Sequence, residues 1–183
     1  MGDPKNQHKT YTTPRVPYDT EMFMEELKLL GAYGLRNKHE LWRIRTELST
    51  LRRRARNLLA QTATEREKQE KEMIRKLHKM GLVQETGTLD DILTLSIEDL
   101  MERRLQTFIF RKGMAKSLWQ ARQFITHGHI SIKGNEVKVP GYHVLIDDEK
   151  VIEYTTVSPF NNKDHQFRRE MAGNELVGGN KVE

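Results

Sequence analysis

Residues 103–135 carry seven lysine and arginine side chains and no aspartate or glutamate, in a 183-residue chain with a formal net charge of +5. A surface of one sign is chemically suited to a polyanion, because Lys and Arg form ion pairs with phosphate oxygens. His127 and His129 would add charge if protonated. The alternative is a solvated basic face without a partner, since charge patterning alone is a weak signal. The seven cations are Arg103, Arg104, Arg111, Lys112, Lys116, Arg122 and Lys133.

Two short helices are predicted to position these side chains. Ser96 and Asp99 have the spacing of a capping box that opens the first helix, which continues to Gly113. Ser117 and Gln120 have the same spacing at the start of the second helix, and the positive end of that helix is itself suited to phosphate. The polar residues of the second helix fall on one outer stripe, which consists of Lys116, Gln120, Gln123 and His127.

A small antiparallel sheet is predicted after these helices, with strands at residues 130–132, 137–139, 144–146 and 151–154. Gly134-Asn135 predicts the first turn, and the acidic run Asp147–Glu149 predicts the last. These acids could be metal ligands, but turn chemistry explains them and no second ligand cluster accompanies them. His127 and His129 could also chelate a metal, but two histidines without further ligands make a poor site.

A second basic segment lies between Arg36 and Arg56, which contains eight basic and two acidic residues. Asn37 or Lys38 is predicted to begin a long helix that buries leucines and isoleucines at helical spacing. Only Glu40 and Glu47 lie within this segment, so we expect most of its arginines to remain available to a phosphate backbone rather than to local salt bridges. The arginines expected on the exposed side are Arg43, Arg45, Arg52, Arg53, Arg54 and Arg56.

The composition narrows the classes of function. With 36% hydrophobic and 31% charged residues, the chain supports one large or two small cores of modest size. It contains no cysteine, so disulfides and thiolate chemistry are excluded. No apolar run is long enough to span a bilayer, and no hydrophobic signal segment begins the chain. A Walker loop, a nucleophile elbow and an HExxH motif are all missing, so we expect no enzyme and no cofactor.

The expected organisation is α+β. It comprises an extended N-terminal arm at residues 1–18, a helical domain at 19–99, a small domain of two helices on an antiparallel sheet at 100–155, and a flexible tail at 156–183. Proline in the arm and glycine in the tail favour these two assignments. The arm could order on RNA or remain disordered. Residues 64–81 are predicted to be an ordinary exposed helix, because their charges are of mixed sign.

The run RRLQTFIFRKGMAKSLWQARQFITHGHISIKGNEVKVPGY resembles the small RNA-binding domain of translation proteins, and most closely that of the universal protein-four family of the small ribosomal subunit. The segment ELKLLGAYGLRNKHELWRIRTELSTLRRRARNLL resembles the helical part of the archaeal and eukaryotic form of that family, and the tail favours the archaeal form. The resemblance implies an insertion of the small domain into the helical one. It also implies binding to the 5′ region of small-subunit ribosomal RNA as an early assembly protein.

The same resemblance implies a cytoplasmic, ribosome-bound chain that lies beside protein five near the messenger RNA entry path and contributes to translational accuracy. We expect no membrane partner, no small-molecule substrate and no bound metal. Two other classes stay open, a stand-alone RNA chaperone or accessory protein and an enzyme with an appended RNA-binding domain. The candidate RNA-binding residues are Arg43, Arg45, Arg52, Arg53, Arg54, Arg56, Arg103, Arg104, Arg111, Lys112, Lys116, Ser117, Gln120, Arg122, Gln123, His127 and Lys133.

Overall fold

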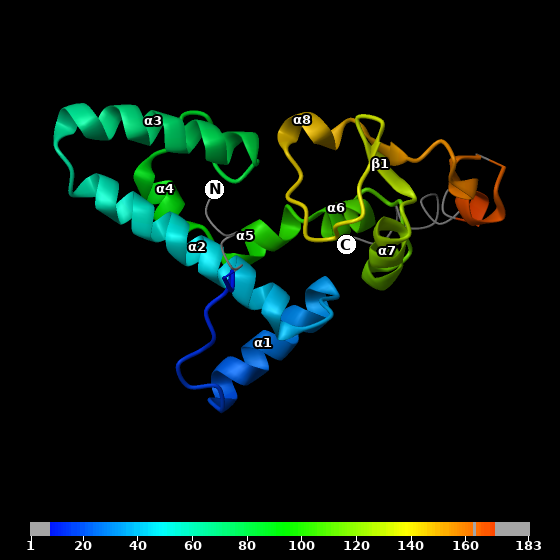
Figure 1. Ribbon diagram of the computed structural model, residues 1–183, viewed down its shortest axis with the longest axis horizontal. Helices are drawn as coiled ribbons and strands as arrows, with labels where there is room; N and C mark the ends of the chain where they lie inside the picture. The colour runs from blue at the N-terminus through cyan, green and yellow to red at the C-terminus, as the bar shows by residue number, and fades with distance from the viewer. Residues whose placement is uncertain (1–7, 163, 171–183) are drawn as a thin grey trace, which may run out of the picture. The chain divides into compact units, whose positions relative to one another are not determined.

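This computed structural model describes residues 8–162 and 164–170, leaving aside the side chains of residues 63–65 (Figure 1). The contacts divide the chain into two compact units, each described here by itself. The first unit consists of Met1–Ile74 and Glu85–Met101, and the second of Arg75–Gln84 and Glu102–Glu183. The sequence-based division differs from this one chiefly because it assigns residues 75–84 to the helical domain.

The first unit is helical. Its elements are α1 (Thr20–Tyr33), α2 (Lys38–Leu59), the first part of α3 (Ala63–Lys79), α4 (Leu89–Thr94) and most of α5 (Ile97–Glu102). Asn37 caps α2, because its side-chain oxygen accepts a hydrogen bond from the Glu40 amide at 3.2 Å. The predicted start and inward stripe of α2 are confirmed, and its fully or largely buried residues are Leu41, Ile44, Leu48, Ala55 and Leu58.

The inward face of α1 differs from the predicted one. Apolar spacing along residues 20–33 predicts that Phe23 and Leu27 are buried, but they are 42% and 43% exposed, whereas Glu26 is 5% exposed. Glu26 lies inside because its carboxylate is paired with Lys38 Nζ at 3.0 Å and accepts a hydrogen bond from Trp42 Nε1 at 2.9 Å. A buried carboxylate is tolerated when it has such partners, so pairing rather than hydrophobicity decides this face.

The second unit places two helices on a small antiparallel sheet, as the sequence predicts. Its further elements are α6 (Leu105–Arg111), α7 (Leu118–Thr126), β1 (Ile130–Ile132), β2 (Asn135–Glu136), α8 (Ile146–Glu149), β3 (Ile152–Tyr154) and the 3-10 turn Pro159–Asn161. The sheet order is β2-β1-β3, with Ile132 opposite Asn135 and Ile130 opposite Tyr154. The helices and the sheet share one core that includes Leu105, Ile109, Phe124, Ile125, Ile130, Val144 and Ile152.

The first predicted helix of the basic stretch is broken in two. Its capping box is confirmed, since Asp99 Oδ2 accepts from the Ser96 amide at 2.7 Å and Ser96 Oγ accepts from the Asp99 amide at 3.2 Å. The helix ends at Glu102, and Arg104 is extended, with φ −72° and ψ 140°. The break forms because Arg103 and Arg104 pair with a distant segment: the Val144 amide donates to the Arg103 carbonyl at 2.9 Å, and Arg104 forms an isolated antiparallel bridge with His143.

The predicted sheet differs from the observed one in several details. The strand expected at residues 137–139 is not formed, because β2 comprises Asn135–Glu136, and the acidic run expected to form the last turn lies in α8. The turn between β1 and β2 is Lys133-Gly134 rather than Gly134-Asn135, with φ of 52° and 79° at its two residues. Positive φ at both central residues defines the turn type whose twist matches that of the flanking strands. The strand expected at residues 144–146 is also not formed, because the chain turns into the short helix α8 at Ile146.

The described parts of both terminal segments are packed. Thr12 of the arm is held on α2, where its amide donates to Thr46 Oγ1 at 3.0 Å. In the segment expected to begin the tail, Phe160 and Phe167 contact the Phe124 ring with centroid distances of 4.7 and 5.4 Å. Residues 1–7 and 171–183 lie outside the described part of the chain. No helix among the described residues has the length and apolarity needed to cross a membrane.

Candidate nucleic-acid interface

The α2 helix presents arginines that have no intramolecular partner. Arg43, Arg53, Arg54 and Arg56 are exposed, and their guanidinium groups form no ion pair or hydrogen bond with any residue that the structure describes. A guanidinium offers five donors in a planar fork, which matches two phosphate oxygens at once. Four such groups on the outer side of one helix therefore form a surface suited to a phosphate backbone.

Two further arginines of α2 are held in place by the first unit. Arg45 lies 3.6 Å from Glu26 Oε1, and Arg52 donates from Nη2 to the Leu95 carbonyl at 2.5 Å. The bond to Leu95 fixes the Arg52 guanidinium, whose Nε is buried without a hydrogen-bond partner. Arg45 is exposed and keeps donors that can reach an anion, whereas the role of Arg52 is mainly structural.

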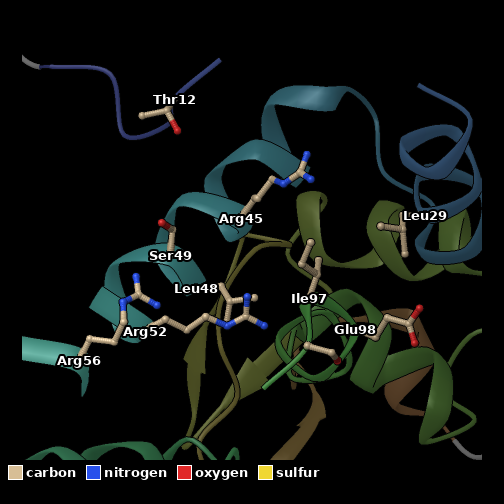
Figure 2. Close-up of a pocket in the computed structure, with 10 residues that line it drawn as sticks. Thr12, Leu29, Arg45, Leu48, Ser49, Arg52, Arg56, Ile97 and Glu98 are labelled. Carbon is tan, nitrogen blue, oxygen red and sulfur yellow. The ribbon is translucent and has the colours of Figure 1, made fainter. Parts of the chain in front are cut away.

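A cleft of about 700 Å³ lies beside α2 within the first unit. Figure 2 shows Arg45, Ser49, Arg52 and Arg56 along α2, with Ile97 and Glu98 lining the cleft from α5. Three guanidinium groups face one carboxylate in this lining, so the cleft carries a positive balance. The remaining lining residues are Thr12, Leu29, Leu48 and Ser96, of which the two leucines give part of the wall an apolar character.

Most cations of the basic stretch in the second unit are bound within the chain. Arg111 donates to both Glu102 carboxylate oxygens, at 3.2 and 2.9 Å, and Lys112 Nζ donates to two backbone carbonyls at 3.0 Å. Arg103 is paired with Glu149 at 2.6 Å. These contacts tie helices and loops of the small domain together. Arg103, Arg111 and Lys112 consequently have structural roles, and their expected contact with RNA stays a prediction.

Arg104 requires a correction, because it was expected to bind RNA. It is only 4% exposed and occupies the N-cap position of α6, where its backbone bridges to His143. A guanidinium enclosed by the domain cannot reach a phosphate backbone without rearrangement. We therefore remove Arg104 from the proposed interface.

Lys133 has an exposed side chain that reaches the buried carboxylate of Asp148. Its Nζ lies 2.6 Å from Asp148 Oδ1, and the same carboxylate accepts a hydrogen bond from the Tyr142 hydroxyl at 2.9 Å. The bond from Lys133 holds the pKa of the Asp148 carboxyl below its usual value, and Asp148 in turn raises the pKa of Lys133. Burial and the bond to Asp148 raise the pKa of Tyr142. These contacts link the β1–β2 turn to α8.

The remaining polar side chains gather on and around α7. The Ser117 hydroxyl accepts from the Gln120 amide at 3.2 Å, while Gln120 Oε1 accepts from the Lys116 amide at 2.7 Å. The predicted capping box is thus present in a shifted form. Lys116 Nζ also pairs with Glu170 and lies 5.4 Å from the Phe167 ring centroid. Gln123 is exposed on the outer side, as expected.

His127 is exposed at the end of α7, and its ring stacks parallel to that of His129 with a centroid distance of 6.3 Å. Burial is the main cause that lowers the pKa of His129. No group of three or more potential ligands suited to a metal ion occurs among the described residues.

Sequence reasoning missed one prominent residue of this surface, Trp119, which is 56% exposed on α7. The signal was present in its position, because Trp119 falls outside the buried stripe formed by Leu118, Ala121, Phe124 and Ile125. A large aromatic side chain off the buried stripe of a short helix must face solvent or a partner.

The small domain with its preceding arginine-rich helices places the chain among the S4-domain proteins, and residues 103–150 match the family described as the S4 domain. The chain is 49% identical over 166 residues to small ribosomal subunit protein uS4 of Ignicoccus hospitalis, covering 91% of this chain and all of that protein. Over 174 residues it is 44% identical to the same protein of Hyperthermus butylicus, which covers 94% of this chain and 99% of that protein. It is 47% identical over 174 residues to that of Thermoplasma acidophilum, which covers 93% of this chain and 87% of that protein. The chain belongs to the small ribosomal subunit protein uS4 family, which confirms the resemblance inferred from the sequence.

Proposed function

We propose that this chain is a structural constituent of the small ribosomal subunit that binds small-subunit ribosomal RNA. The observation that carries the proposal is the row of exposed arginines Arg43, Arg53, Arg54 and Arg56, which have no partner in the described chain. A chain that acts alone would gain by pairing these groups with acidic side chains of its own, since unneutralised like charges on one helix repel one another.

The mechanism is electrostatic and geometric. The α2 surface supplies several guanidinium groups that neutralise phosphates and release their condensed counterions. The α7 surface supplies amide and basic side chains, among them Arg122 and Gln123, that can reach sugars and base edges of unpaired nucleotides. An RNA junction brings phosphates close together and so repels itself. A protein that neutralises phosphates of neighbouring strands offsets that repulsion and favours the folded junction.

The finer assignments rest on the uS4 family and on the sequence resemblance. We propose that the chain binds the 5′ region of the ribosomal RNA early in assembly. We further propose that it lies beside protein five near the messenger RNA entry path, where it contributes to translational accuracy as part of cytoplasmic ribosomes. The proposal includes no catalytic step, no cofactor and no small-molecule substrate.

Equilibrium binding to separated RNA fragments tests this function. The purified chain is titrated into the 5′ region of small-subunit ribosomal RNA and, in parallel, into the 3′ region of similar length at the same salt concentration. We expect tighter binding to the 5′ region by a factor that exceeds ten, because in protein–DNA recognition specific sites are typically at least three orders of magnitude tighter than non-specific ones. Equal affinity for the two fragments would refute the assignment to the 5′ region.

A further inference from the structure

The exposed ring of Trp119 is not explained by the fold. The chain has two tryptophans. Trp42 is half-buried and donates its Nε1 hydrogen bond to Glu26 Oε1 at 2.9 Å, so the first unit accounts for it. Trp119, in contrast, is 56% exposed and has no ring contact or hydrogen bond from its side chain with any residue that the structure describes. Tryptophan is highly buried on average, so an open ring indicates a binding surface.

The neighbours of Trp119 are polar and basic. Arg122 and Gln123 lie three and four residues further along α7 and are therefore adjacent to Trp119 on the helix surface. Arg122 Nη1 donates to Gln106 Oε1 at 3.3 Å, which restrains the guanidinium. The α7 sequence LWQARQFIT contains no acidic residue. The ring thus lies among side chains that attract phosphate and can hydrogen-bond a base edge.

We propose that Trp119 is a stacking platform for an unpaired RNA base, with Arg122 and Gln123 beside it to bind the phosphate and the edge of that nucleotide. The inference rests on the proposed RNA-binding function and specifies its ligand at α7. A base inside a duplex offers no free face to a ring that approaches from outside, whereas a loop, bulge or single strand does. The absence of acidic residues from α7 favours RNA over a protein neighbour that would present basic groups to this helix.

Intrinsic fluorescence and affinity together test the stack. In the Trp42→Phe variant, Trp119 is the remaining tryptophan and reports on α7 directly. The probes are an RNA hairpin with a long single-stranded loop and the fully paired duplex of its stem. We expect the loop hairpin to quench Trp119 emission and the duplex to leave it largely unchanged. The Trp119→Ala substitution should weaken binding to the loop hairpin about 5- to 150-fold, which is the effect of removing one aromatic ring from a stacked base.

Two control variants separate stacking from other causes. Trp119→Phe retains an aromatic face and should recover most of the affinity for the loop hairpin. Val157→Ala removes an apolar side chain that is 89% exposed in the same unit and should leave the affinity unchanged. Because Trp119 is exposed, its replacement should leave the circular dichroism spectrum of the chain unaltered.

The outcomes distinguish the inference from the function on which it rests. The stacking proposal is overturned if the Trp119→Ala variant binds the loop hairpin with unchanged affinity and the hairpin does not quench Trp119 in the Trp42→Phe variant. RNA binding itself would then stand, and the exposed ring would be explained by a protein neighbour instead. If the chain binds neither RNA, the proposed function itself fails. Equal quenching by the duplex would also contradict the specificity for an unpaired base.

Discussion

Replacing Arg53, Arg54 and Arg56 together with alanine removes three exposed cations from α2 while leaving the core of the first unit unchanged. Arg52 is deliberately retained, because it donates to the Leu95 carbonyl at 2.5 Å and its loss would disturb the fold. The three replaced side chains make no intramolecular ion pair or hydrogen bond within the described residues. Alanine has the highest helix propensity, so the variant should fold with nearly unchanged stability.

The magnitude follows from counterion release. Each phosphate contact contributes about 0.9 to the slope of log K against log salt on a duplex, and about 0.7 on a single strand. Three contacts should therefore reduce the steepness of the slope by about 2 to 3. Over a fourfold rise in salt, the original chain should lose about 20- to 40-fold more affinity than the variant does.

The assay is equilibrium binding to the 5′ fragment of small-subunit ribosomal RNA at several salt concentrations. The matched control replaces Lys68, Lys71 and Arg75 of α3 with alanine, since these are also exposed cations and their loss changes the net charge by the same amount. We expect the control to keep the slope of the original chain. Equal slopes for the α2 variant and the original chain would exclude these arginines from the interface. If the α2 variant and the α3 control changed the slope by the same amount, the effect would depend on net charge and not on the position of the arginines.

Two further predictions concern the stability of the second unit. Gly128→Ala should lower the free energy of unfolding in urea by about 1–3 kcal/mol, because Gly128 has φ +77° and an added Cβ would lie 1.6 Å from Glu136 Oε1. The control is Gly31→Ala in α1, which should not destabilise the chain, because a Cβ there meets nothing within 4 Å. Asp148, whose pKa is below its usual value, contributes stability that is present above about pH 4 and is lost as the pH falls through its folded pKa. The Asp148→Asn variant should therefore show a shallower loss of stability than the original chain below about pH 4, and an identical acid dependence of the two chains would contradict the role of the Lys133–Asp148 pair.

Local sequence patterns predicted the parts of the fold that local physics controls. The α2 helix begins at its Asn37 cap and buries Leu41, Ile44 and Leu48, because capping and apolar spacing act within a few residues. The exposed arginines of α2 follow from the same spacing. Their lack of partners was also predictable, since the segment contains few acids.

The errors occur where a distant contact decides the structure. Apolar spacing continues across Arg103 and Arg104, so no local signal marks the break between α5 and α6. The break depends instead on pairing with His143 and Val144, about forty residues further along the chain. The burial of Arg104 and the pairing of Lys133 with Asp148 have the same origin, because a cation finds its carboxylate only after the domain has folded.

Sedimentation of the tagged chain from a cell lysate through sucrose gradients, at low and at high salt, tests the central claim most directly. We predict that the chain migrates with small ribosomal subunits in nearly one-to-one amount and stays bound at high salt. A chain that remains at the top of the gradient, or that leaves the subunits at moderate salt, would contradict a structural role and would favour the stand-alone RNA chaperone.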